Sequence, residues 1–254
     1  MKLNIFTKLF SWSLFIALIP LTIISIISYR SAKIEMEKEI YNNLITISDY
    51  KTLLMRQFFT ERELDIETLA HRNIFNNVEK LCDAYKKGMD SAEYLKWETY
   101  FREQLQFKMQ KSDFHDFLII CSNDPEGEVV FSIQKEADLG TNLLTGIYKN
   151  TILAQSFRNV QTVMAPDITS FQYYPPSQRG AAFVIAPIFK EGVIVAILAG
   201  QLENTEAFNI LNDYTGLKTT GETVVWTKMG NRMQCAAPTR FDPEADKRRV
   251  ILGS

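Results

Sequence analysis

The segment from Asp167 to Arg179 gathers side chains that could recognise a small molecule. It contains Asp167, Tyr173, Tyr174 and Arg179 among further rings and amides. Aromatic walls with a few polar groups form small-molecule pockets, and a guanidinium can hold a carboxylate through two parallel hydrogen bonds. The alternative is that the tyrosines cover their own core and that Arg179 is solvated. The residue types therefore indicate binding chemistry.

Two apolar strands follow this segment and are expected to carry further site residues. In the alternating register of a strand, Phe183 shares a face with Ile185. Gln201 ends a face formed by alternate residues from Val193 to Ala199, so a polar side chain closes an apolar stripe. The candidate ligand-binding residues are Asp167, Tyr173, Tyr174, Arg179, Phe183 and Gln201.

One segment has the glycine spacing of a phosphate-binding loop. Gly216–Thr223 matches the two glycines and the final threonine of that motif, but Glu222 stands where the lysine should be. A carboxylate at this position would repel a nucleotide phosphate. We interpret the segment as a structural turn.

The histidines and cysteines do not have the spacing of a metal site. His71 and His115 are the two histidines, and neither has a second histidine or a cysteine at ligand spacing. The three cysteines are too few and too scattered for a disulfide framework. We expect hydrogen-bonded or surface histidines, and we expect Cys121 to pack as a small apolar side chain in a core strand. No catalytic residue, metal or cofactor is expected.

A membrane anchor is predicted near the N-terminus. Leu9–Tyr29 is uncharged, and twelve of its residues are Leu, Ile or Phe. As a helix this segment would be about 30 Å long, and its insertion would gain roughly 4 to 7 kcal/mol. A cleaved signal peptide is the alternative, but the apolar run is long and no small-residue cleavage site follows it. We predict a cytoplasmic tip and an uncleaved anchor in residues 1–30, with the span at 9–29 and the lipid bilayer as a partner.

Charge argues against nucleic acid as a partner. The 254-residue chain has a formal net charge of −2, and every acidic residue lies at or beyond Glu35. The body after the anchor is therefore mildly acidic, whereas non-specific binding to nucleic acid needs clustered basic residues.

A long helix with a heptad-like stripe is predicted over residues 31–87. The stripe has spacings of four and three residues and contains one polar position. It could pack against its own domain or pair with the same helix of a second protomer, and the sequence leaves both uses open. The stripe consists of Ile40, Leu44, Ile47, Lys51, Leu54 and Phe58.

The remaining pattern predicts an α+β fold with an antiparallel sheet. A second amphipathic helix is expected over Ser91–Gln110, and strand-like runs begin after Ser112. We expect strands or extended segments at Phe114–Cys121, Val129–Gln134, Val160–Ala165, Ser170–Tyr174, Ala181–Phe189 and Val193–Glu203, with helices within Asp138–Arg158 and over Asn204–Asp213.

Several of these segments, in this order, resemble the start of a double Cache sensory module. The resemblance rests on Phe117–Ile120, Gly127–Ser132, Asp138–Leu143, Tyr174–Phe189, Gly192–Leu202 and Thr215–Thr223. Such modules are PAS-like extracytoplasmic sensors of bacterial receptors. The resemblance implies an anchor, a long helix, two stacked lobes, a second membrane helix and a cytoplasmic output domain, with a ligand over the concave face of the sheet. In amino-acid-binding relatives an aspartate lies at about the position of Gln201.

The resemblance divides the chain into four expected regions. These are the anchor at 1–30, two helices at 31–110, a membrane-distal PAS-like lobe at 111–212 and the start of a membrane-proximal lobe at 213–254. The chain then looks like the front part of a receptor in the inner membrane, with residues 31–254 extracytoplasmic. The output would be a histidine kinase, a nucleotide cyclase or a chemotaxis adaptor, and this part is expected to be non-catalytic. The alternative is a complete membrane-anchored structural or adaptor protein without a ligand.

Overall fold

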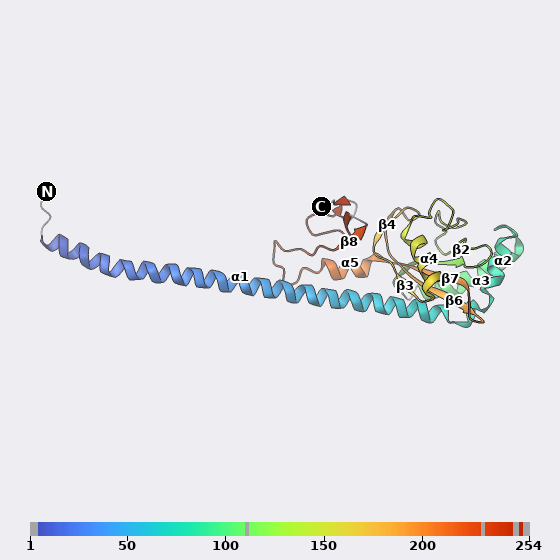
Figure 1. Cartoon of the computed structure of the whole chain (residues 1–254), viewed down its shortest axis with the longest axis horizontal. Helices are drawn as coiled ribbons and strands as arrows, with labels where there is room; N and C mark the ends of the chain where they lie inside the picture. Colours follow the sequence, from blue (N-terminus) through green and yellow to red (C-terminus); the bar gives the residue numbers. More distant parts are fainter. Residues whose placement is uncertain (1–4, 110–111, 230–231, 246–248, 251–254) are drawn as a thin grey trace. The chain divides into compact units, whose positions relative to one another are not determined.

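The computed structural model describes residues 5–109, 112–229, 232–245 and 249–250. The chain divides into two compact units, residues 1–50 and residues 51–254. Helix α1 (Ile5–Ala70) contributes to both units (Figure 1). Each unit is described below by itself.

The described part of the first unit is helical throughout. Of the helices in the described residues, α1 alone is long and apolar enough to cross a membrane, and its apolar window holds no buried residue. Pro20 lies inside this helix, and Thr22 Oγ1 donates to the carbonyl oxygens of Leu18 and Ile19. The expected apolar helix at residues 9–29 is therefore present.

The second unit begins with the rest of α1, a 3₁₀ turn (Asn73–Asn77), α2 (Val78–Tyr85) and α3 (Ala92–Met109). The expectation of one helix over residues 31–87 was wrong, because Arg72 is extended, with ψ 150°. The break lets the ring of Phe75 stack on that of Phe101 with centroids 5.6 Å apart. No glycine or proline marks this turn, so tertiary packing decides it.

Five strands form an antiparallel sheet in the order β2-β1-β7-β6-β3. This order and the preceding helices give the expected α+β fold with a PAS-like sheet. The strands are β1 (Phe114–Cys121), β2 (Val129–Ser132), β3 (Asp167–Ile168), β6 (Phe183–Lys190) and β7 (Val193–Leu202).

Smaller elements complete the second unit. Strands β4 (Gln172–Tyr174) and β5 (Arg179–Ala181) form a separate hairpin, and helix α5 (Asn204–Asn212) follows β7. A three-stranded sheet is formed by β8 (Trp226–Met229), β9 (Arg232–Cys235) and β10 (Arg249–Val250).

Helix α4 (Ile152–Val163) replaces one predicted extended segment. Its N-cap is Thr151, whose hydroxyl accepts from the backbone N–H of Ala154 at 3.3 Å. Val160–Ala165 was expected to be extended, but the helix continues to Val163. Val160 is fully buried in the core, and its packing there stabilises the last turn of the helix. The helix ends at Met164, which takes the left-handed conformation with φ 58°.

Alternate residues of the large sheet serve two separate cores. Phe117 and Ile119 of β1 pack with α1, α2 and α3, on what we call the α1–α3 face. Leu118 and Ile120 pack with α4, on the α4 face. On the α1–α3 face, a Cβ on Gly200 would lie 2.6 Å from atoms of Ile66 and Phe114, so glycine lets α1 approach the sheet closely.

A register shift interrupts the alternation that we expected for β7. Ile188 pairs with Ala196, but the next residue, Phe189, pairs with Ile194. Val195 is left over as a bulge and packs on the α1–α3 face, not with Ile197 and Ala199 on the α4 face. The rest of the expected stripe, from Ile197 to Gln201, keeps its alternation.

The packing expected for Cys121 was wrong, because it forms a disulfide with Cys82. The bond joins α2 to the end of β1, across a sequence separation of 39 residues, with the Cα atoms 6.0 Å apart. The two cysteines become neighbours only when α2 packs on the sheet, so their spacing in the sequence did not indicate the pair. Cys235 remains a buried free thiol.

The predicted stripe on α1 changes its surroundings along the helix. Ile40 and Leu44 are 47% and 45% exposed, whereas Lys51 and Phe58 are 7% and 3% exposed. The C-terminal half of the stripe therefore packs on the second unit itself. The N-terminal half leaves an apolar surface on the first unit.

Candidate functional site

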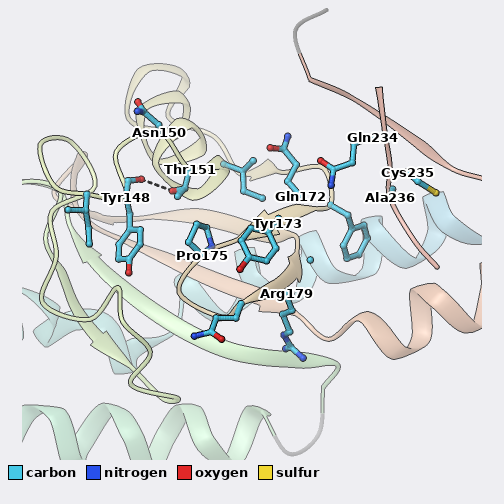
Figure 2. Close-up of a pocket in the computed structure, with 15 residues that line it drawn as sticks. Tyr148, Asn150, Thr151, Gln172, Tyr173, Pro175, Arg179, Gln234, Cys235 and Ala236 are labelled. Carbon is cyan, nitrogen blue, oxygen red and sulfur yellow. Dashed lines mark hydrogen bonds between the residues drawn. The ribbon is translucent and has the colours of Figure 1, made fainter. Parts of the chain in front are cut away.

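A cavity of about 990 Å³ lies in the second unit beside the β4–β5 hairpin (Figure 2). It is bounded by the segment that leads into α4, by the hairpin and by the end of β9. Among the described residues that line it, Arg179 is the one charged side chain. The lining residues are Ile147, Tyr148, Asn150, Thr151, Ile152, Phe171, Gln172, Tyr173, Pro175, Gln178, Arg179, Gly180, Gln234, Cys235 and Ala236.

Two of the six candidate residues, Tyr173 and Arg179, line this cavity. Tyr173 is 57% exposed, whereas the next residue of β4, Tyr174, is fully buried, as the alternation of side chains along a strand requires. Both residues belong to the hairpin, whose turn places Gln178 in a left-handed conformation with φ 53°. The structure thus brings one ring and one cation to the cavity wall.

Tyr174 and Phe183 belong to the core beneath the cavity. Tyr174 is fully buried and its ring meets that of Phe183 edge to face, with centroids 4.8 Å apart. Its hydroxyl donates to Oδ2 of Asp138 at 2.6 Å. Burial is the main cause of the raised pKa values of Tyr174 and Asp138. These groups anchor the hairpin onto the sheet.

Asp167 lies at the edge of the sheet and not at the cavity. It begins β3, pairs with Ile185 of β6 and accepts a short hydrogen bond from the hydroxyl of Ser156 on α4. Its carboxylate therefore ties α4 to the sheet edge.

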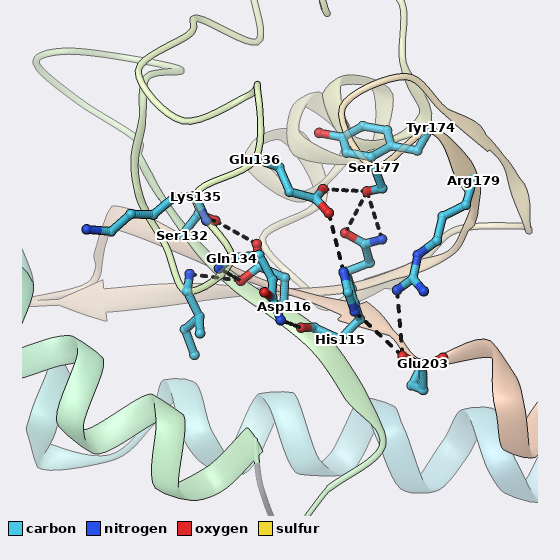
Figure 3. A network of polar contacts seen from close by, with 12 residues as sticks. His115, Asp116, Ser132, Gln134, Lys135, Glu136, Tyr174, Ser177, Arg179 and Glu203 are labelled. Carbon is cyan, nitrogen blue, oxygen red and sulfur yellow. Dashed lines mark hydrogen bonds and ion pairs between the residues drawn. The ribbon is translucent and has the colours of Figure 1, made fainter.

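Gln201 is hydrogen-bonded to Ser177 of the hairpin turn and so joins the polar network that contains Ser177, Glu136 and His115 (Figure 3). Its Nε2 donates to Ser177 Oγ at 3.0 Å, and Ser177 donates to Oε2 of Glu136 at 2.5 Å. His115 lies between two carboxylates, with Nε2 3.3 Å from Glu136 Oε1 and Nδ1 3.6 Å from Glu203 Oε2. The network links the hairpin to β1 and to the end of β7.

Asp116 extends this network into the sheet. It is 1% exposed and accepts hydrogen bonds from Ser132 Oγ at 2.7 Å and from the backbone N–H groups of Ile133 and Gln134 at 2.8 and 3.1 Å (Figure 3). Burial nevertheless raises the pKa of Asp116 to about 7. A carboxyl group with this pKa changes its charge near neutral pH.

Arg179 is the side chain best suited to hold a ligand anion. Its Nε and Nη2 are buried and have no hydrogen-bond partner among the described residues. Glu203 Oε2 lies 3.6 Å from Nη2, which is too long for a hydrogen bond, although the charges attract each other. Arg179 is among the residues that line the cavity, and a guanidinium can hold a carboxylate through two parallel hydrogen bonds, so it is the candidate residue for a ligand anion.

Sequence reasoning missed the other walls of the cavity. Tyr148 and Thr151 come from the segment before α4, Gln234 and Cys235 come from β9, and Ala236 directly follows β9. A tyrosine three residues before an N-cap threonine carries no pattern that separates it from a surface residue. The β9 residues lie about fifty positions beyond the hairpin, and only the fold brings them to it.

Comparison with known proteins gives no family assignment. No family model matches the sequence, and no curated protein matches it. Among solved structures, the chain is similar to the ligand-binding domain of the Pseudomonas fluorescens chemoreceptor CtaA in complex with L-serine, with TM-score 0.43, 13% identity and coverage of 76% of this chain and 66% of that chain.

Two further solved structures are of the same kind. One is the sensor domain of the Vibrio cholerae histidine kinase DctB (TM-score 0.40, 14% identity, 71% of this chain and 65% of that chain). The other is the ligand-binding domain of the Campylobacter jejuni chemoreceptor Tlp3 in complex with 4-methylisoleucine (TM-score 0.38, 11% identity, 77% of this chain and 85% of that chain). The chain thus spans slightly less than two thirds of the CtaA and DctB domains. These similar structures are sensory domains of receptors and kinases, the class that the sequence resembles, but TM-scores below 0.5 assign no function by themselves.

Proposed function

We propose that this chain is the ligand-sensing, extracytoplasmic region of a bacterial transmembrane receptor. The observation that carries the proposal is a cavity with aromatic side chains in its wall, in which Arg179 is the one charged side chain among the described lining residues. Such a cavity suits a small anion with an apolar or aromatic body. The domain boundaries proposed above, at 30, 110 and 212, place this cavity mainly in the membrane-distal lobe.

The compartment and the anchor belong to the same proposal. Disulfides persist outside the reducing cytoplasm, so the Cys82–Cys121 bond supports an extracytoplasmic second unit. The apolar part of α1 supports an uncleaved anchor in the inner membrane. A reporter enzyme fused after Tyr41 should be active only when it folds outside the cytoplasm, and activity in the cytoplasm would overturn this topology.

Self-association is proposed through the first unit. Ile40 and Leu44 continue the heptad spacing of α1 and are about half exposed. A second copy of the same helix would cover them. Cross-linking of a Leu44→Cys variant in membranes, compared with Thr52→Cys on the exposed side of α1 in the second unit, tests this contact. Equal cross-linking at both positions would contradict it.

The ligand class is tested on the whole chain in lipid nanodiscs with phenylacetate as the anionic probe. We expect phenylacetate to raise the melting temperature and phenylacetamide, its neutral analogue, to leave it unchanged. A probe at one hundred times its dissociation constant would add about 2.7 kcal/mol of stability. Arg179→Gln should abolish the shift, whereas Arg56→Gln, on the exposed surface of α1, should retain it.

Two outcomes would contradict this function. Equal stabilisation by phenylacetate and phenylacetamide would remove the role of Arg179 as an anion site. No stabilisation by phenylacetate or by a panel of other small carboxylates would remove the sensing proposal and favour an adaptor without a ligand. The output coupled to this region would be a histidine kinase, a nucleotide cyclase or a chemoreceptor module.

A further inference from the structure

The wall of the cavity is directly connected to the start of helix α5. Arg179 lines the cavity and pairs with Glu203 at 3.6 Å, and Glu203 is the N-cap residue of α5. The neighbouring lining residue, Gly180, accepts a hydrogen bond at 2.6 Å through its carbonyl oxygen from Nδ2 of Asn204, the first residue of α5. The hairpin thus holds the N-terminus of α5 at two adjacent points.

The same helix is attached to α1 by a buried cation near its start. Arg62 of α1 is 8% exposed, and its Nη2 lies 2.8 Å from Oε2 of Glu206 in the first turn of α5. Arg62 also contacts Asp113 at 2.5 Å and Asp65 at 3.5 Å. Several carboxylates compensate the charge of Arg62, which stabilises its buried position between α1 and α5.

A second buried cation of α1 holds the other end of α5. Lys51 Nζ donates to the carbonyl oxygens of Ile210, Leu211 and Asp213 at 3.1, 2.8 and 2.5 Å. The last carbonyls of a helix lack partners within the helix, and they carry its negative dipole end. A lysine at this place therefore satisfies α5 and fixes it to α1, and Arg62 lies about three helical turns further along α1.

We propose that α5 transmits the occupancy of Arg179 from the cavity to α1. A ligand anion at Arg179 competes with Glu203, so the N-terminus of α5 loses its ion pair with the hairpin when the cavity is filled. Arg62 and Lys51 pass the changed position of α5 to α1. The anion has to favour one arrangement of α5 for this to work, and competition for a single guanidinium supplies that difference. This relay rests on the proposed anion site.

Hydrogen exchange of the whole chain in nanodiscs tests the relay, with phenylacetate as the probe. We expect phenylacetate to slow exchange in the hairpin, residues 171–181, and to speed exchange at least threefold in α5 and in residues 51–62 of α1. In Glu203→Gln, α5 and the α1 segment should already exchange faster without the probe. Phenylacetate should then protect the hairpin of this variant without a further change in α5. The matched control is Glu191→Gln, at the exposed β6–β7 turn.

The outcomes separate the relay from the sensing function. Protection of the hairpin without any change in α5 or α1 would overturn the relay and leave the anion site standing. If phenylacetate does not protect the hairpin, unchanged exchange of α1 in ligand-free Glu203→Gln would still overturn the relay. A general loss of protection that includes β6 would show that Glu203 is merely structural. Asn204→Ala, which removes only the bond to Gly180, then decides whether local release of α5 reaches α1.

Discussion

The two faces of the five-stranded sheet are built from the same strands for different purposes. The α1–α3 face is a continuous apolar core to which a disulfide adds a covalent link. The α4 face also contains an apolar core, but beside it lie His115, Asp116, Gln201 and the anchored hairpin. Alternating side chains let one strand serve both faces, so the side chains of one face can be changed without replacing those of the other. Four predictions test this division.

The largest effect is expected for the α1–α3 face. Phe117→Ala removes a fully buried ring and should lower the free energy of unfolding by about 3–5 kcal/mol. Ile147→Ala, at an 80% exposed position on the cavity wall, should change it by less than about 0.5 kcal/mol. Urea unfolding of both variants measures the difference. Equal losses of unfolding free energy in the two variants would contradict the proposed difference between the two faces.

The disulfide should contribute almost as much to the same face. Replacing both Cys82 and Cys121 by serine removes a cross-link between positions 39 residues apart, so we expect the free energy of unfolding to fall by about 2–4 kcal/mol. Reduction of the unmodified protein should lower the melting temperature by as much as the double replacement does. In the double variant reduction should have no further effect, and a further drop would show that another bond is involved.

The pH dependence of stability should come from the α4 face. Asp116 has a raised pKa of about 7, so the folded state retains a proton that the unfolded state loses near pH 4. Stability should therefore fall between about pH 4 and 7, by at most about 1.4 kcal/mol per pH unit from this group, and level off above pH 7. Asp116→Asn should flatten the curve of melting temperature against pH. Some slope should remain from Asp138, whose pKa is also raised.

The smallest effect on stability is expected at the cavity wall. Tyr173→Ala removes a ring that is 57% exposed and should change the unfolding free energy by less than about 0.5 kcal/mol. Its loss should nevertheless weaken phenylacetate binding by about threefold to tenfold, because the ring is a wall of the site. Tyr173→Phe keeps the ring and should bind normally in calorimetric titrations. Normal binding by the alanine variant would place the probe elsewhere.

The sheet could be predicted from the sequence because strand periodicity and turn residues agree along it. Phe114–Cys121 was expected as a strand and is β1 with the same bounds. The break at Arg72 and the bulge at Val195 were not predicted, because neither position carries a glycine or a proline. Both result from packing against partners that are distant in the sequence.

The candidate site divides in the same way. Tyr173 and Tyr174 are adjacent and equivalent in type, yet the first lines the cavity and the second is core. Strand alternation predicts that they point apart, but it does not say which of them faces the cavity. Gln201 was expected to end an apolar stripe, and its bond to Ser177 depends on the hairpin turn. Its role in binding stays a prediction.

Lys51, the polar residue in the stripe of α1, limits the length over which the α1 helices of two copies could pair. Its ammonium is occupied by the carbonyls of α5, and Phe58 beyond it is covered by its own chain. The contact between two α1 helices would therefore have to end at Lys51. Residues 31–50 then form a pairing surface about 30 Å long, which corresponds to fewer than three heptads. So short a coiled coil would be weak alone, and a stable pair would need further contacts, for example between the apolar segments at residues 9–29.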